Sequence, residues 1–218
     1  MQLVIIMARD LNSKCKKCRR AVEKLFLKGD RCVTPKCAMV RKSYPPGAHG
    51  KKMSRGGGVS EFGRQLAMKQ KIKRIYGVME RQFRKHFEDV RKRSGVAGDL
   101  LIARLEMRLD NVAYRAGLGA SRSLSRQLVK HGALKINGKK VDVPSYEVKV
   151  GDEVSISDTK KEKNYFIGQI SLLKNRKDFP SWLQFDKEKV TWKISGIPKK
   201  QEAEGNIDPQ LVVEYYSR

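Results

Sequence analysis

Apolar residues recur every three or four positions through the middle of the chain, with charged residues between them. Over 61–93 this repeat is that of an amphipathic helix, and Ser94-Gly95 interrupts it. A second helix is expected to begin near Asp99, a suitable N-cap, and to end at Gly117. The positions that recur in the two helices, all apolar except His86, are Ile72, Ile75, Met79, Phe83, His86, Phe87, Val90 and then Leu101, Leu105, Leu109, Val112, Ala116.

Two-residue alternation replaces the helical period beyond residue 133. A helix capped by Ser121 is expected to close at Gly132, and apolar alternation on both sides of Asn137-Gly138 predicts a tight β-hairpin. The sheet is expected to continue through 148–156, with further strands at 190–194 and 211–213. A short helix is expected over 19–28, a stiff proline-glycine loop over 44–50, and a flexible stretch over 51–60. These elements predict an α+β fold.

Charge is high and unevenly distributed. The chain has 48 Lys and Arg against 23 Asp and Glu, a formal net charge of +25. Residues 1–94 hold 26 of these basic side chains and 7 of the acidic ones, so the first half is by far the more basic. Such an excess indicates a polyanionic partner, RNA or DNA.

The chain shows no signal for a membrane. No run approaches the ~20 apolar residues that a membrane-spanning helix requires. The opening MQLVIIM is short and lacks a basic start and a cleavage site, so we do not expect a secretory signal. Met7 is an alternative start of translation, which would make the preceding residues an extension. We expect a reducing, cytoplasmic setting in which disulfides do not form.

Four cysteines form two close pairs, Cys15-x2-Cys18 and Cys32-x4-Cys37. This spacing is typical of a closed tetrahedral site, in which four thiolates bind one structural zinc ion and leave no coordination position open for catalysis. Surrounding Lys and Arg residues would offset the negative charge of such a centre. An iron–sulfur cluster is an alternative, since four cysteines can also hold one. The remaining alternative is four unligated, partly buried thiols.

Three cations fall on one stripe of the helix after Ser121. Arg122, Arg126 and Lys130 are four residues apart, and Leu124 and Leu128 are expected to form the opposite, buried face. The following hairpin adds Lys135, Lys139 and Lys140. The stripe and hairpin together predict a phosphate-binding surface, whereas a merely solvated charged face is the alternative. No candidate enzyme site emerges, because His49 and His131 have no nucleophile or acid partner nearby in the sequence.

Several motifs, in order along the chain, resemble one known family. RLDNVAYR at 108–115, SRSLSRQLVKHG at 121–132 and INGKKV at 136–141 resemble the small RNA-binding domain named after ribosomal protein S4. The flanking LFLKGDRC at 25–32, YPPGAHG at 44–50, KQKIKRIYGV at 69–78 and LVVEYYS at 211–217 resemble the bacterial ribosomal proteins of this family. The resemblance spans about residues 8–218.

The resemblance implies a domain organisation. Residues 1–7 would be an extension, 8–50 a four-cysteine metal knuckle with a Pro/Gly loop, and 51–98 a basic helical domain. Residues 102–165 would be an inserted small α/β RNA-binding domain of the S4 type, and 166–218 a C-terminal segment that packs back on the helical domain. Family members either keep or lack the four cysteines, and this chain has the spacing of the metal-binding kind.

The resemblance also implies a function. It indicates a structural, non-enzymatic protein of the small ribosomal subunit that binds the five-prime domain of the rRNA and nucleates assembly of the subunit body. Implied partners are ribosomal proteins S5 and S12, with which the family influences translational accuracy, mRNA at the entry tunnel, and in some members the protein's own mRNA. The implied RNA-binding residues are Arg41, Lys42, His49, Lys51, Lys52, Lys69, Lys71, Lys73, Arg74, Arg108, Arg115, Arg122, Arg126, Lys130, Lys135, Lys139 and Lys140.

Two other functions compete with this one. An RNA-modifying enzyme can use the same RNA-binding domain, but the stretch after residue 160 is too short for a catalytic domain of more than a hundred residues. A zinc-dependent regulator of DNA or mRNA is the third possibility. Sequence-selective DNA binding without a preference for rRNA would favour that regulator.

Overall fold

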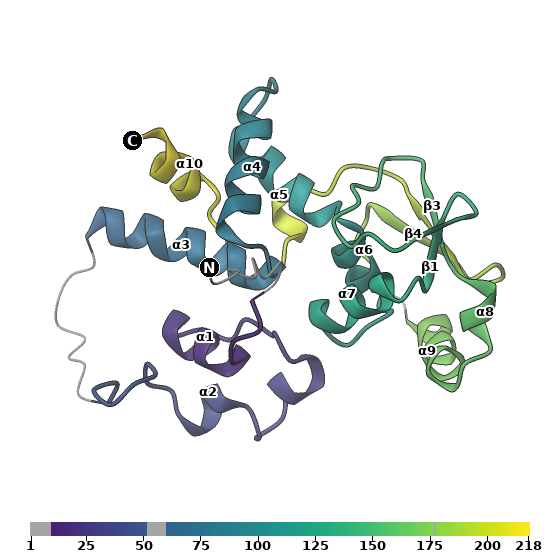
Figure 1. Cartoon of the computed structure of the whole chain (residues 1–218), viewed down its shortest axis with the longest axis horizontal. Helices are drawn as coiled ribbons and strands as arrows, with labels where there is room; N and C mark the ends of the chain where they lie inside the picture. The colour runs from purple at the N-terminus through teal and green to yellow at the C-terminus, as the bar shows by residue number, and fades with distance from the viewer. Residues whose placement is uncertain (1–9, 52–59, 177) are drawn as a thin grey trace, which may run out of the picture. The chain divides into compact units, whose positions relative to one another are not determined.

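The computed structural model describes residues 10–51, 60–176 and 178–218 (Figure 1). The proposed extension at 1–7 with Met7, the residue Lys52, and most of the glycine-containing stretch 51–60 lie outside these residues. The chain divides into two compact units. Unit 1 comprises Met1–Leu101 with Gly205–Arg218, and unit 2 comprises Ile102–Glu204. No helix of the described residues is long and apolar enough to cross a membrane.

Unit 1 is helical. Its elements are α1 (Lys14–Ala21), the 3-10 turn η1 (Gly29–Cys32), α2 (Ala38–Arg41), α3 (Glu61–Tyr76), α4 (Glu80–Arg91), the first part of α5 (Ala97–Glu106), and α10 (Gln210–Ser217). The apolar faces of α3 and α4 form its core, with Ile72, Phe83 and Val90 almost completely buried. The C-terminal helix α10 lies beside α3 (Figure 1), and the Tyr216 ring stacks on Phe87 with 4.7 Å between centroids.

Unit 2 combines helices with one antiparallel sheet. The helices are the rest of α5, α6 (Leu109–Arg115), α7 (Arg122–Lys130), α8 (Asp158–Lys161), α9 (Asn164–Asn175) and the 3-10 turn η2 (Lys200–Glu202). The strands are β1 (Leu134–Ile136), β2 (Lys139–Val141), β3 (Glu153–Ile156), β4 (Leu183–Asp186) and β5 (Thr191–Ile194), in the order β2-β1-β3-β5-β4. Apolar residues of the helices and the sheet form one continuous core around Trp192 and Leu134, as expected for a two-layer arrangement.

The local turn and cap signals of unit 2 are confirmed. Ser121 is the N-cap of α7, and its hydroxyl accepts a hydrogen bond from the Leu124 backbone N–H at 3.3 Å. Asn137 and Gly138 both have positive φ, 49° and 79°, and connect β1 to β2 as the predicted hairpin. This is the turn geometry that Asn-Gly favours.

Several predicted elements are wrong in extent or type. The N-terminal helix begins at Lys14 and carries the first cysteine pair, instead of lying between the two pairs. The expected single helix over 61–93 is split at Gly77, which ends α3 in a left-handed conformation with φ 65°. The expected helix over 99–116 is likewise two helices, α5 and α6. Residues 211–213, predicted as a strand, lie in α10 because Val212 is buried in unit 1.

The predicted boundary at residue 166 also differs from the observed division of the chain. Residues 166–204 supply α9, β4 and β5, and β5 pairs with β3 in the sheet of unit 2. Only Gly205–Arg218 returns to the helical unit. The strands β4 and β5 contribute Leu183, Trp192 and Ile194 to the same core as β1 and β3.

Candidate functional site

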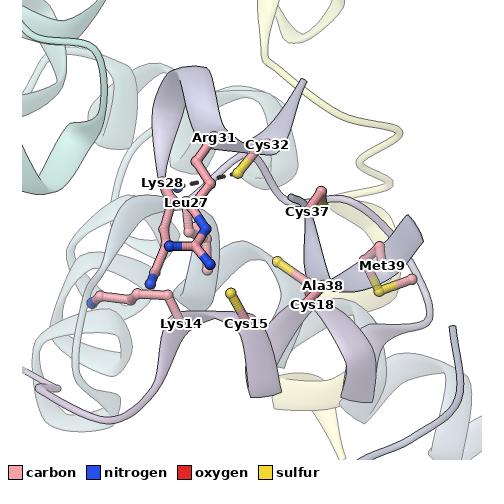
Figure 2. A pocket seen from close by; sticks show the side chains of 10 residues that line it. All are labelled: Lys14, Cys15, Cys18, Leu27, Lys28, Arg31, Cys32, Cys37, Ala38 and Met39. Carbon is pink, nitrogen blue, oxygen red and sulfur yellow. Dashed lines mark hydrogen bonds between the residues drawn. The ribbon is translucent and has the colours of Figure 1, made fainter. Parts of the chain in front are cut away.

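The four cysteines line one pocket in unit 1 (Figure 2). Cys15 and Cys18 lie one turn apart on α1, Cys32 ends η1, and Cys37 precedes α2. Figure 2 shows the first pair directed from α1 toward the segment that carries Cys32. All four are free thiols; three are buried and Cys15 is partly exposed. The remaining lining residues are Lys14, Leu27, Lys28, Arg31, Ala38 and Met39.

The thiols are near enough to influence one another electrostatically. Burial raises the pKa of the Cys18 thiol, and negative charge on Cys32, Cys15 and Cys37 raises it further. The backbone N–H of Lys28 donates to Cys32 Sγ at 3.4 Å, a contact that stabilises a thiolate. As these side chains stand, however, no three His, Cys, Asp or Glu residues in the described part of the chain converge closely enough to hold a metal ion.

Four of the predicted RNA-binding arginines take part in ion pairs inside unit 2. Arg108 donates from Nε and Nη2 to the two carboxylate oxygens of Asp110, at 3.2 and 2.9 Å, and Arg126 donates to the same carboxylate at 2.8 Å. Arg108 is only 3% exposed. A guanidinium held in this way cannot reach a phosphate without breaking a buried pair.

The ion pairs of these arginines form an internal network in unit 2. Its second half is centred on Glu106, which is 1% exposed. Arg115 donates to both carboxylate oxygens of Glu106, at 2.8 and 2.9 Å, and Asn111 donates to one of them at 2.7 Å. Arg122 donates to Glu204 at 2.8 Å and lies over the Tyr114 ring at 4.5 Å.

The predicted buried face of α7 is only partly confirmed, since Leu128 packs against the core but the fully buried residues are others. Ser125 and Val129 are buried, whereas Leu124 and Leu128 are only partly so. The arginines of the predicted stripe therefore face carboxylates of α5, of α6 and of the segment that contains Glu204. Of the three cations in that stripe, only Lys130 is exposed. The predicted phosphate-binding stripe is in large part an internal electrostatic network.

Three of the four predicted cations of α3 are similarly paired with carboxylates. Lys69 and Lys73 both donate to Glu80, Lys69 also lies 4.1 Å from the centre of the Tyr215 ring, and Lys71 pairs with Glu23. Burial and the nearby charge of Arg20 lower the pKa of Arg74. The three lysines hold α3 to α4, α10 and the N-terminal segment, whereas Arg74 has no ion pair within the described residues.

Of the remaining predicted cations, one is paired with a carboxylate and the others are exposed. In unit 2, Lys135 pairs with Asp158, while the exposed ones are Lys130, Lys139 and Lys140. In unit 1 the exposed residues are Arg41, Lys42, His49 and Lys51, which flank or belong to the Tyr44–Gly50 loop.

A basic surface on the outer side of α4 was not predicted from the sequence. Its cations are exposed, and five of the six have no ion pair within the described residues, whereas Arg84 pairs with Glu88. They are Arg81, Arg84, Lys85, Arg91, Lys92 and Arg93. The three- and four-residue spacing of these cations, opposite the buried Phe83 and Phe87, was the signal that could have identified the surface.

The chain also contains a His-x-Glu triplet, His86-Phe87-Glu88, a pattern associated with zinc-dependent deaminases. It lies on α4, where Glu88 pairs with Arg84, and neither His86 nor Glu88 lines the cysteine pocket. The triplet and the cysteines therefore do not form a common site.

Comparison with known proteins agrees with the fold and with the motifs. The model of the ribosomal protein S4/S9 N-terminal domain matches residues 9–106, and that of the S4 domain matches residues 107–154. Small ribosomal subunit protein uS4 of Thermodesulfovibrio yellowstonii is 47% identical over 212 residues, 97% of this chain and all of the relative. The uS4 proteins of Pelotomaculum thermopropionicum and Thermus thermophilus, with the same coverage, are 45% and 44% identical. The chain belongs to the uS4 family of small ribosomal subunit proteins.

Proposed function

We propose that the chain is a structural, rRNA-binding component of the small ribosomal subunit in the cytoplasm, and not an enzyme. The observation that carries this function is the similarity to uS4 proteins over their whole length. The net charge of +25 supports it, because RNA phosphates require many distributed cations. The finer proposals are binding to the five-prime rRNA domain, nucleation of subunit assembly, contact with S5, S12 and mRNA, and repression of the protein's own mRNA.

Within this function, we assign phosphate contact to cations that are exposed and not already paired with carboxylates. On unit 1 we choose the α4 surface without Arg84, which pairs with Glu88, and the residues that flank the Tyr44–Gly50 loop, and on unit 2 we choose Lys130, Lys139 and Lys140. The four arginines of the internal network act on RNA binding through the fold of unit 2. Substituting Arg122 or Arg126 is therefore a poor probe of RNA contact, since it also removes an ion pair of the internal network, with Glu204 or with Asp110.

The salt dependence of rRNA binding tests this assignment. Lys85→Gln/Lys92→Gln/Arg93→Gln removes three cations of the α4 surface, and Lys187→Gln/Lys189→Gln/Lys193→Gln removes three exposed cations elsewhere as a matched control. A five-prime-domain rRNA fragment is titrated with each full-length variant at several salt concentrations. We expect the slope of log K against log salt to fall by about 1 for each lost phosphate contact in the α4 variant alone. Equal losses in both variants would refute a specific surface.

We also propose that Cys15, Cys18, Cys32 and Cys37 hold one structural zinc ion. Thiolates suit this soft ion, all four thiols line one pocket, and Lys14, Lys28 and Arg31 can offset the charge of four thiolates. Binding would require the sulfurs to turn toward a common point. When bound, zinc would supply a cross-link between α1 and the segment 32–37. An iron–sulfur cluster is the alternative cofactor.

Native mass spectrometry and absorbance of anaerobically purified protein distinguish these cases. One colourless ion of zinc mass supports the proposal, and chelation should then accelerate amide exchange in residues 14–41. A brown species with the mass of an iron–sulfur cluster would replace zinc by that cofactor. Protein that stays metal-free when excess zinc is added would refute both.

A further inference from the structure

The Tyr44–Gly50 loop is fastened to α1 by one arginine. Arg19 Nε donates to the Tyr44 carbonyl at 2.9 Å, and Arg19 Nη2 donates to the Pro45 carbonyl at 3.1 Å. The same guanidinium lies 4.7 Å from the centre of the Tyr44 ring. Arg19 therefore contacts two consecutive carbonyls and an aromatic face at once. A lysine would keep the charge but lose this planar two-point contact.

The loop is also closed on itself. The Gly50 N–H donates to the Gly47 carbonyl at 3.3 Å, and Gly50 is buried. A Cβ atom at Gly50 would collide with the Pro45 carbonyl oxygen, a backbone atom that cannot move aside without opening the loop. The Pro45 carbonyl is thus held between Arg19 on one side and Gly50 on the other. Any side chain at residue 50 would force the loop open.

Exposed cations lie within the Tyr44–Gly50 loop and directly beside it in the sequence. Arg41 and Lys42 precede it, His49 lies within it, and Lys51 follows it, with Lys51 Nζ 5.6 Å from the Tyr44 ring centre. Arg19 itself is only partly exposed, and its donors are directed at the loop. Its position suits it to organise these cations, whereas a direct phosphate contact would compete with its bonds to the loop.

We infer that Arg19 is a positioning residue for RNA binding. It holds the Tyr44–Gly50 loop in the shape that presents Arg41, Lys42, His49 and Lys51 to phosphates of the rRNA. This inference rests on the proposed rRNA-binding function. Its physical basis is preorganisation: a loop already held in its binding shape loses less conformational freedom on binding, so affinity is higher without any added contact.

Two charge-neutral changes test the inference in the full-length protein. Arg19→Lys keeps the charge and removes the two-point contact, and Gly50→Ala opens the loop without altering any cation. Arg20→Lys is the matched control, since Arg20 is the exposed neighbour on α1. We expect both test variants to bind the five-prime-domain fragment roughly ten-fold more weakly, corresponding to about 1.4 kcal/mol, with an unchanged salt slope. Amide exchange should accelerate in residues 44–51 and stay unchanged in α3 and α4.

The possible outcomes are distinct. Wild-type affinity in a variant whose loop amides exchange faster would overturn the inference, because the loop would then be loose without consequence. A second result would also overturn the inference: Arg19→Lys binds with wild-type affinity, while Arg19→Gln shows a reduced salt slope. Arg19 would then contact a phosphate directly. Failure of the wild-type protein to bind the fragment in a salt-dependent way would refute the proposed function itself, and the inference with it.

Discussion

Glu106 is the carboxylate on which the internal network of unit 2 most depends. It is 1% exposed and accepts two hydrogen bonds from Arg115 and one from Asn111. Glu106→Gln preserves the volume of the side chain, removes its charge and replaces one of its two acceptor oxygens by a donor NH2 group. Arg115 then stays in a buried position and keeps its ion pair with the partly exposed Glu204, 3.2 Å away.

The loss of unfolding free energy expected for Glu106→Gln follows from this geometry. Removing one partner of a buried ion pair destabilises a protein by about 3–5 kcal/mol, and the residual pairing with Glu204 favours the lower end. With a urea dependence of about 1.5 kcal/mol per molar, a loss of ~3 kcal/mol lowers the unfolding midpoint by roughly 2 M. The partly exposed Glu204 should matter less, so we expect Glu204→Gln to cost about 1 kcal/mol or less.

Tryptophan fluorescence during urea unfolding is the assay. The chain has two tryptophans, Trp182 and Trp192, and both are buried in unit 2, so their signal reports this unit in the full-length protein. A midpoint shift for Glu106→Gln no larger than that for Glu204→Gln would refute the reasoning. Arg115→Met combined with Glu106→Gln should recover part of the loss, because no uncompensated guanidinium remains at residue 115.

Two further predictions concern Gly117, which has no room for a side chain, and the pH dependence of the Glu80 ion pairs. Gly117 has a φ of 78°, and in Gly117→Ala the new Cβ would lie 2.5 Å from Arg176 Nη1 and 2.8 Å from Leu173 Cδ2. This variant should therefore destabilise unit 2 by about 1–3 kcal/mol in the fluorescence assay. Gly168→Ala is the control, because a Cβ at that position of α9 meets open space and should not destabilise the unit. Burial raises the pKa of Glu80, but hydrogen bonds from Lys73, Lys69 and Tyr216 outweigh it and lower the value from 4.5 to about 2. Glu80 therefore stabilises the fold above pH 4.5 and loses this effect as pH falls toward 2. Glu80→Gln should weaken the acid sensitivity of α10 amide exchange in this window; an acid response equal to that of wild type would contradict it.

Local signals in the sequence determined a substantial part of unit 2. Ser121 identifies a helix start because its hydroxyl bonds to a backbone N–H three residues away, and Asn137-Gly138 identifies a hairpin because both residues accept positive φ. The cysteine spacing likewise identified the segments that line one pocket. These properties depend on residues close together in the chain, and the sequence is sufficient for them.

Residues 211–213 show where local pattern was insufficient. Three consecutive apolar residues fit a strand or a buried helix equally well. The helix forms because it buries Val212 and stacks Tyr216 on Phe87, far away in the sequence. Gly77, by contrast, was a visible stop signal within the long helical repeat.

The assignment of cations to RNA was the most dependent on tertiary structure. Helical spacing correctly places Arg122 and Arg126 on one stripe, but it cannot tell whether that stripe faces water or a carboxylate. The partners, Asp110 and Glu204, are 16 and 82 residues away from these arginines. The sequence by itself thus determined that the protein is a basic α+β member of an RNA-binding family. Only the tertiary structure decided which cations remain free for phosphate, because an internal carboxylate and an RNA phosphate compete for the same guanidinium.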